Sequence, residues 1–145
     1  GLYKCRITYD ENQKEVEFLP YTPKPVRTLK LVVDNNISYE HKFKDRHEIE
    51  ALFEQRGACD DILIVKDERI TDTSYANIVF KRKKNWYTPW NVLLHGTQRE
   101  YLLERGVIVE EAIGVEDIRS FSKFKLINAM LRFDGPEIDV DQIKA

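Results

Sequence analysis

The segment at residues 70–80, ITDTSYANIVF, holds the chain's most suggestive group of polar side chains. Asp72 supplies a carboxylate and Asn77 an amide, with hydroxyl groups between them, directly before an apolar run. These groups at a strand entry can bind a small molecule through hydrogen bonds. The same run of Thr, Asp and Ser is also typical of a turn capped by its own side chains. The sequence leaves both interpretations open.

Lys42 is the second candidate for chemistry. A lysine amine reacts with a carbonyl group only where burial or neighbouring charge lowers its pKa. His41, Lys44, Arg46 and His47 surround it in the sequence and can have this effect. The same residues are equally typical of a solvated basic patch. Lys44 is the alternative reactive lysine of this segment.

Gly96, Thr97 and Gln98 open a helical pattern and form a candidate anion site. The N–H groups at a helix N-terminus and the helix dipole favour a phosphate, and a glycine lets the backbone approach it closely. Thr97 with Glu100 also reads as a capping box, which would form without any ligand.

The composition restricts the class of protein. Of the 145 residues, 33% are charged and 42% hydrophobic, which suits one well-packed core. The 23 basic and 25 acidic side chains nearly cancel, so we expect neither nucleic acid nor a membrane as a partner. The sequence shows no membrane helix or secretion signal, which favours a cytoplasmic protein. Cys5 and Cys59 lack metal-ligand spacing, and we expect reduced thiols and no metal site.

Hydrophobic periodicity predicts a mixed fold. Alternation predicts a hairpin with strands at 3–9 and 15–20. Helices are predicted at 43–55, ending at Gly57, and from residue 97 to Gly106, with a short helical turn at 115–120. Further strands are predicted at 26–33, 61–65, 75–81, 86–88, 107–112 and 125–130. We therefore expect an α/β or α+β fold.

Three features in a fixed order resemble the class IV aminotransferases, the fold type IV pyridoxal 5'-phosphate (PLP) enzymes. They are Lys42, the pattern T-D-x-x-x-x-N-I-V at 71–79, and G-x-x-R at 96–99. The resemblance implies the D-amino acid aminotransferase-like fold, mainly its C-terminal domain. It divides the chain into a remnant of the N-terminal lobe at 1–35 and a PLP-binding domain at 36–145.

The resemblance also implies roles for the polar residues. Lys42 would be the catalytic residue, forming a Schiff base with PLP and moving the substrate's α-proton. Asp72 would stand beside the cofactor's ring nitrogen, where the family usually has glutamate; the shorter side chain must approach more closely or act through a water. Asn77 is implied as a further cofactor-binding residue.

Two backbone segments are implied as contacts of the cofactor phosphate. The first is the helix start at Gly96, Thr97 and Gln98, and the second is the end of the last predicted strand at Asn128 and Ala129. Both would bind through backbone N–H groups.

Lys4 and Arg6 share one face of the first predicted strand. The resemblance places this strand on the substrate side, where the two cations would bind a carboxylate. Charged residues on an edge strand also protect against aggregation, so this interpretation has a structural alternative.

The activity implied is that of an aminotransferase or aminodeoxychorismate lyase, acting on an amino acid or aminodeoxychorismate, normally as a homodimer. We also expect that the family's N-terminal lobe segment, with the arginine that binds the cofactor phosphate, is missing from this chain. A catalytically inactive structural or interaction protein of the same fold is the alternative, favoured by that missing segment and by aspartate in place of glutamate.

Overall fold

The computed structural model describes residues 3–9, 14–20, 25–38 and 46–145. A four-stranded sheet is formed by β3 (Leu29–Val33), β4 (Asp61–Lys66), β5 (Arg69–Thr73) and β11 (Ile143–Lys144), in the order β11-β3-β4-β5. β3 runs parallel to β4 and β11, whereas β4 and β5 are antiparallel. The mixture of parallel and antiparallel pairs confirms the predicted mixed fold class.

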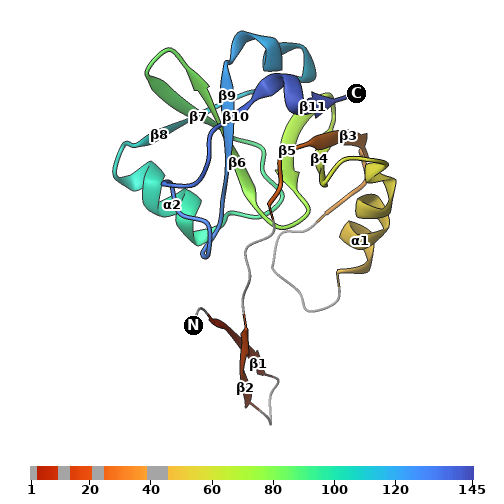
Figure 1. Cartoon of the computed structure of the whole chain (residues 1–145), viewed down its shortest axis with the longest axis vertical. Coiled ribbons are helices and arrows are strands. Elements are labelled where there is room, and N and C mark those ends of the chain that lie inside the picture. The colour runs from red at the N-terminus through yellow and green to blue at the C-terminus, as the bar shows by residue number, and fades with distance from the viewer. Residues whose placement is uncertain (1–2, 10–13, 21–24, 39–45) are drawn as a thin grey trace.

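A second sheet has five strands in the order β10-β9-β6-β7-β8. They are β6 (Asn77–Arg82), β7 (Asn85–Pro89), β8 (Ile108–Glu111), β9 (Lys123–Ile127) and β10 (Ile138–Asp139). The N-terminal hairpin of β1 (Tyr3–Tyr9) and β2 (Lys14–Pro20) is a sheet of its own, and its predicted pairing is confirmed (Figure 1).

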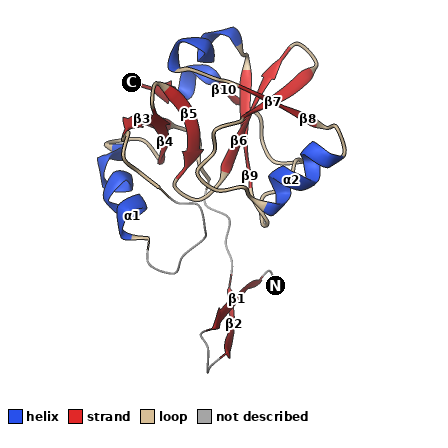
Figure 2. Ribbon diagram, turned by 180° about the vertical axis from the view of Figure 1, so that it is seen from behind, coloured by secondary structure: helices blue, strands red, loops and turns tan. Residues whose placement is uncertain are grey.

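Helices cover the outer faces of the two larger sheets (Figure 2). α1 (His47–Phe53), continued by the 3-10 turn η1 (Glu54–Arg56), lies beside the four-stranded sheet, and α2 (Thr97–Glu104) lies beside the five-stranded sheet. Two more 3-10 turns are η2 (Val115–Ser120) and η3 (Val140–Gln142). None of the helices in the described part of the chain is long and apolar enough to cross a membrane.

The main core lies between the two sheets, and strand alternation explains its composition. Leu63 and Val65 of β4 and Ile78 and Phe80 of β6 belong to this core. Ile62 and Ile64, which alternate with them in β4, belong instead to the cluster beneath α1, and Val79 belongs to the cluster beneath α2. The period of two therefore assigns each side chain to one layer.

β5 is the main correction to the predicted elements. The sequence predicted a turn and then a strand from residue 75, but the strand β5 ends at Thr73 and β6 begins at Asn77. β5 can be both polar and buried because its hydroxyl groups are hydrogen-bonded within the protein. Thr71 Oγ1, for example, donates to the Ile64 carbonyl at 2.8 Å. The last predicted strand, 125–130, also ends early, at Ile127.

The predicted boundary after residue 35 stays a prediction. β3 lies before this boundary, and its residues pair with those of β4 beyond it. The short strands β10 and β11 were not predicted, since two-residue strands leave no periodic pattern.

Candidate functional site

Four separate segments meet at one end of the five-stranded sheet. Asn77 begins β6 and pairs with Ile127, the last residue of β9, so Asn128 follows directly beside it. Asp72 near the end of β5 and Gly96 before α2 both contact the Asn77 side chain. The fold thus brings together residues that lie as far apart in sequence as 72 and 128.

Asp72 is the buried acid of this group, with 5% of its surface exposed. Its Oδ1 accepts a hydrogen bond from Asn77 Nδ2 at 3.2 Å, and its Oδ2 accepts one from the Leu94 backbone N–H at 3.0 Å. Burial raises the pKa of this carboxyl from 3.8 to about 7, although these hydrogen bonds and the charge of Arg99 lower it. Asp72 can therefore hold or release a proton near neutral pH, which is typical of functional carboxyls.

Asn77 links Asp72 to the start of α2. Its Nδ2 also donates to the Leu94 carbonyl oxygen, at 2.9 Å. On the other side of the amide, a Cβ added to Gly96 would lie 2.4 Å from Asn77 Oδ1, closer than two such atoms can approach. Glycine is thus required at position 96 by the close contact with Asn77.

The N-terminus of α2 begins with Gly96 as the N-cap residue and has no side-chain cap. Thr97 is the first helical residue, so the capping box suggested for Thr97 and Glu100 is wrong. Glu100 instead accepts a hydrogen bond from Arg99 Nη1 at 2.6 Å. The first N–H groups of the helix are consequently left without a capping side chain and can bind an anion.

Asn128 forms a tight turn after β9. Its Oδ1 accepts hydrogen bonds from the backbone N–H groups of Met130 and Leu131 at 2.8 and 2.7 Å. Its Nδ2 donates to the Tyr75 carbonyl at 3.2 Å. The side chain of Asn128 is thus used to shape its own turn and to join it to the turn at 73–76, while the neighbouring Ala129 is exposed.

Thr73 closes the turn between Asp72 and Asn77. Its Oγ1 accepts from the Ala76 N–H at 3.0 Å, and its own N–H donates to the Ala76 carbonyl at 3.0 Å. The alternative of a turn at 71–74 capped by its own side chains is therefore wrong for Thr71 and Asp72, which lie in β5, and the turn that Thr73 caps spans residues 73–76.

Arg46 and Asp61 both contact Ser74 of this turn, and no pattern in the sequence indicated these contacts. Arg46 Nη2 donates to the Ser74 carbonyl. Asp61, at the start of β4 and 1% exposed, has a pKa that burial raises, opposed by hydrogen bonds from Ile62 and Ser74 and by the charge of Arg46. Ser74 thus donates hydrogen bonds to Asp61 and accepts one from Arg46 at its carbonyl, and both partners lie more than ten positions away in the sequence.

Arg99 fixes α2 to the sheet. It is 1% exposed, and its Nη2 donates to the carbonyl of Pro89 at the end of β7, at 3.1 Å. Glu110 of β8 lies 3.5 Å from the same nitrogen. The arginine of the G-x-x-R pattern therefore holds the helix start in place against the strands.

Four predicted residues cannot be placed in this group. Lys42 and the alternative Lys44 lie outside the described residues. Lys4 and Arg6 lie in β1, with their backbones paired to β2, but their side chains are also outside the described part. Their predicted roles stay predictions.

Comparison with known proteins identifies relatives over most of the chain. The model of the amino-transferase class IV family matches residues 10–133. An uncharacterized protein of Haemophilus influenzae is 46% identical over 129 residues, which are 89% of this chain and 69% of that protein.

Solved structures show the same similarity. A candidate 4-amino-4-deoxychorismate lyase from Haemophilus somnus 129PT is 37% identical, with a TM-score of 0.86 over 90% of this chain and 68% of that one. An aminotransferase from Brucella abortus, solved with bound PLP, is 17% identical, with a TM-score of 0.64 over 86% of this chain and 52% of that one. The second similarity concerns the fold alone.

Proposed function

Because the chain belongs to the class IV amino-transferase family, we propose that it binds PLP and acts on an amino-acid-like substrate as an aminotransferase or aminodeoxychorismate lyase. The observation that carries this proposal is the buried carboxyl of Asp72, positioned with Asn77 and Gly96 beside the uncapped N-terminus of α2. The PLP bound to the Brucella abortus aminotransferase supports the choice of cofactor.

The residues present fit a phosphorylated pyridine. The helix start at Thr97 and Gln98 offers N–H groups without a side-chain cap, whereas the Gly96 N–H donates to the Leu94 carbonyl at 3.0 Å. Asp72 accepts hydrogen bonds from Asn77 Nδ2 and from the backbone N–H groups of Leu94 and Leu93, whereas a carboxylate has about four acceptor positions, so one position is left for a ring N–H. A nearby positive ring would lower the pKa of Asp72 and favour its charged form.

When bound, PLP withdraws electrons from the substrate and makes its α-proton removable. Lys42 would bind the cofactor covalently through Nζ and, once released, would move that proton. Asp72 would hold the proton on the ring nitrogen. Backbone N–H groups of Thr97, Gln98 and Ala129 would hold the phosphate, and Lys42 would serve either a transaminase or a lyase.

Covalent labelling tests the role of Lys42. Borohydride reduction after addition of PLP, followed by peptide mapping, is expected to place the label on Lys42. Lys42→Arg keeps the charge of the segment and serves as the matched control, which should remain unlabelled. A label on Lys44, or equal labelling of the variant, would contradict the assignment.

The substrate side and the assembly complete the proposal. Lys4 and Arg6 would bind the substrate carboxylate from β1, and the protein would act in the cytoplasm as a homodimer, with residues 36–145 as the PLP-binding domain. Alanine substitution of both cations should raise KM for the amino-acid substrate more than it lowers kcat. A change in kcat alone would show that these residues do not bind substrate.

A second candidate is a catalytically inactive protein of the same fold. It is favoured by Asp72, whose two oxygens are already hydrogen-bonded within the protein. Visible absorption distinguishes the candidates: addition of PLP to an active protein gives a new band that disappears in Lys42→Arg, and an inactive protein gives none.

A further inference from the structure

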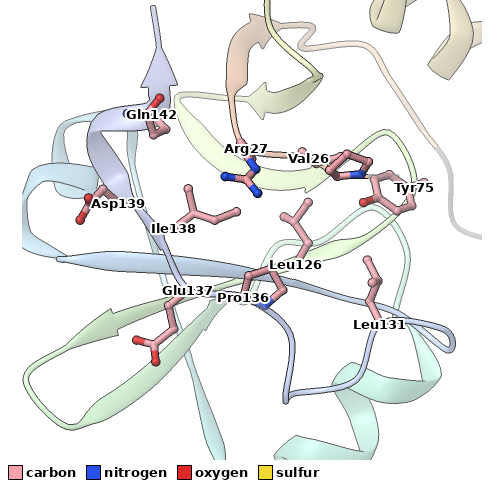
Figure 3. A pocket seen from close by; sticks show the side chains of 11 residues that line it. Val26, Arg27, Tyr75, Leu126, Leu131, Pro136, Glu137, Ile138, Asp139 and Gln142 are labelled. Atoms are coloured by element: carbon pink, nitrogen blue, oxygen red, sulfur yellow. The ribbon is translucent and has the colours of Figure 1, made fainter. Parts of the chain in front are cut away.

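A cavity of about 670 Å³ lies between the segment before β3 and the C-terminal part of the chain (Figure 3). This volume is within the roughly 300–1,000 Å³ typical of small-molecule sites. Asp72, Asn77 and Gly96 do not line it. Most of its described lining is apolar, including Val26, Tyr75, Leu126, Leu131 and Ile138.

Arg27 carries the uncompensated charge of this cavity. The lining also contains Glu137 and Asp139, but each is already paired with a lysine of the five-stranded sheet, Lys81 at 3.3 Å and Lys123 at 2.6 Å. Among the residues that the structure describes, the Arg27 guanidinium has no ion pair within 4.0 Å. Arg27 is thus the one charged group of the described lining without an ion-pair partner, and it is a cation.

Asp60 interacts with Arg27, but its hydrogen bond is with the backbone N–H of Arg27 and not with the guanidinium. Asp60 Oδ2 accepts hydrogen bonds from the backbone N–H groups of Arg27 and Thr28 at 2.9 and 3.2 Å. The hydrogen bond from the Arg27 backbone N–H is the main cause that lowers the pKa of Asp60. The charge of the Arg27 side chain lowers this pKa much less. The donors of the Arg27 side chain remain available to a ligand.

The orientation of Arg27 is shown in Figure 3. Its guanidinium lies over the space bordered by Ile138 and Leu126, while the carboxylates of Glu137 and Asp139 point away from it. A guanidinium offers a planar set of donors that matches a carboxylate in a two-point contact. Beside it, the apolar side chains offer a surface for hydrocarbon.

We propose that this cavity binds a monocarboxylate with an apolar or aromatic body. The carboxylate pairs with Arg27, and the body packs on Leu126, Leu131 and Ile138. The cavity adjoins the candidate cofactor site, because Tyr75 belongs to the 73–76 turn. Binding does not require PLP, so this inference and the proposed function can fail independently.

Titration with 3-phenylpropionate, followed by amide chemical shifts and calorimetry, tests the proposal. Two matched probes separate the contributions: acetate has the carboxylate without the body, and 3-phenylpropan-1-ol has the body without the carboxylate. We expect 3-phenylpropionate to bind most tightly and to shift the amides of Val26, Leu126 and Ile138. Equal affinity for the acid and the alcohol, or shifts elsewhere only, would overturn the proposal.

Substitutions locate the charge that recognises the ligand. Arg27→Gln should weaken binding of 3-phenylpropionate by roughly tenfold to a hundredfold, as expected for hydrogen bonds to a charged group. Arg27 is exposed, so the variant should fold normally, which circular dichroism checks. Arg119→Gln, at an exposed arginine of η2 outside the cavity, is the control and should bind like the wild type. Equal binding by Arg27→Gln would refute the assignment.

Such a carboxylate can belong to a substrate or to a separate effector molecule. Repeating the titration with saturating PLP distinguishes these sources. Affinity for 3-phenylpropionate that is unchanged by PLP identifies an effector site, and affinity that rises identifies a substrate site. Displacement of the probe by PLP would instead show that the cavity is the cofactor site, which contradicts the proposal.

Discussion

Replacement of Asp72 by asparagine should change the pH dependence of stability. Burial raises the pKa of Asp72 in the folded protein from 3.8 to about 7. Below pH about 4 the carboxyl is protonated in both the folded and unfolded states and costs nothing. Between pH 3.8 and about 7 the carboxyl of Asp72 is ionised in the unfolded chain but still protonated in the folded protein, so the free energy of unfolding falls as the pH rises.

The magnitude follows from the difference between the two pKa values, 3.8 and about 7. Each pH unit in this interval costs about 1.4 kcal/mol, which gives about 4 kcal/mol at pH 8. Asp72→Asn removes this cost but can accept only one of the two hydrogen bonds, losing about 1 kcal/mol. We therefore expect the variant to be about 3 kcal/mol more stable than the wild type at pH 8, and no more stable near pH 4.

Urea denaturation of both proteins from pH 4 to 8, without PLP, measures this difference. Asp61, whose pKa burial also raises, affects both curves equally and cancels. Asp134→Asn, at an exposed aspartate, controls for the loss of one charge and should follow the wild-type curve. A difference between Asp72→Asn and wild type that stays constant across this pH range would refute the reasoning.

Two further substitutions test the support of the site. Gly96→Ala places a Cβ 2.4 Å from Asn77 Oδ1 and should cost about 1–3 kcal/mol in urea denaturation and weaken PLP binding; unchanged stability and PLP affinity would contradict the contact. Arg46→Met removes the donor to the Ser74 carbonyl and should cost about 1–3 kcal/mol, whereas Arg46→Lys should recover part of it; equal stability of the Met variant and the wild type would show that the hydrogen bond contributes nothing.

The sequence predicted elements wherever burial follows a simple period. The hairpin of β1 and β2, β4 and the turn η2 lie where alternation and turn residues placed them. β5 was missed because only Ile70 in it is apolar, and its hydroxyls are satisfied by backbone groups of other residues. A polar strand of this kind cannot be distinguished from a loop until its partners are known.

The candidate site was predictable only in its sequence-local parts. Asp72 and Asn77 stand out because they flank a turn, and Gly96 because it precedes a helix. The hydrogen bond from Leu94 to Asp72 spans 22 residues, and that from Arg46 to Ser74 spans 28, so neither has a local signature. Tertiary packing creates such contacts, and a single sequence contains no record of them.

The environment of Asp72 is more easily explained by a ligand than by folding alone. An acid that costs several kcal/mol at neutral pH is retained where its charge is used. The charge of Arg99 lowers the pKa of Asp72 only weakly compared with the effect of burial, and the donors of Arg99 are directed to Pro89 and Glu100. A positively charged ring beside Asp72 would convert the cost into an attraction, and it would do so in the pH range in which the buried Asp72 destabilises the free protein most. Stabilisation by PLP that grows from pH 4 to 8 in the wild type, and does not in Asp72→Asn, is the consequence that separates a cofactor site from an unused buried acid.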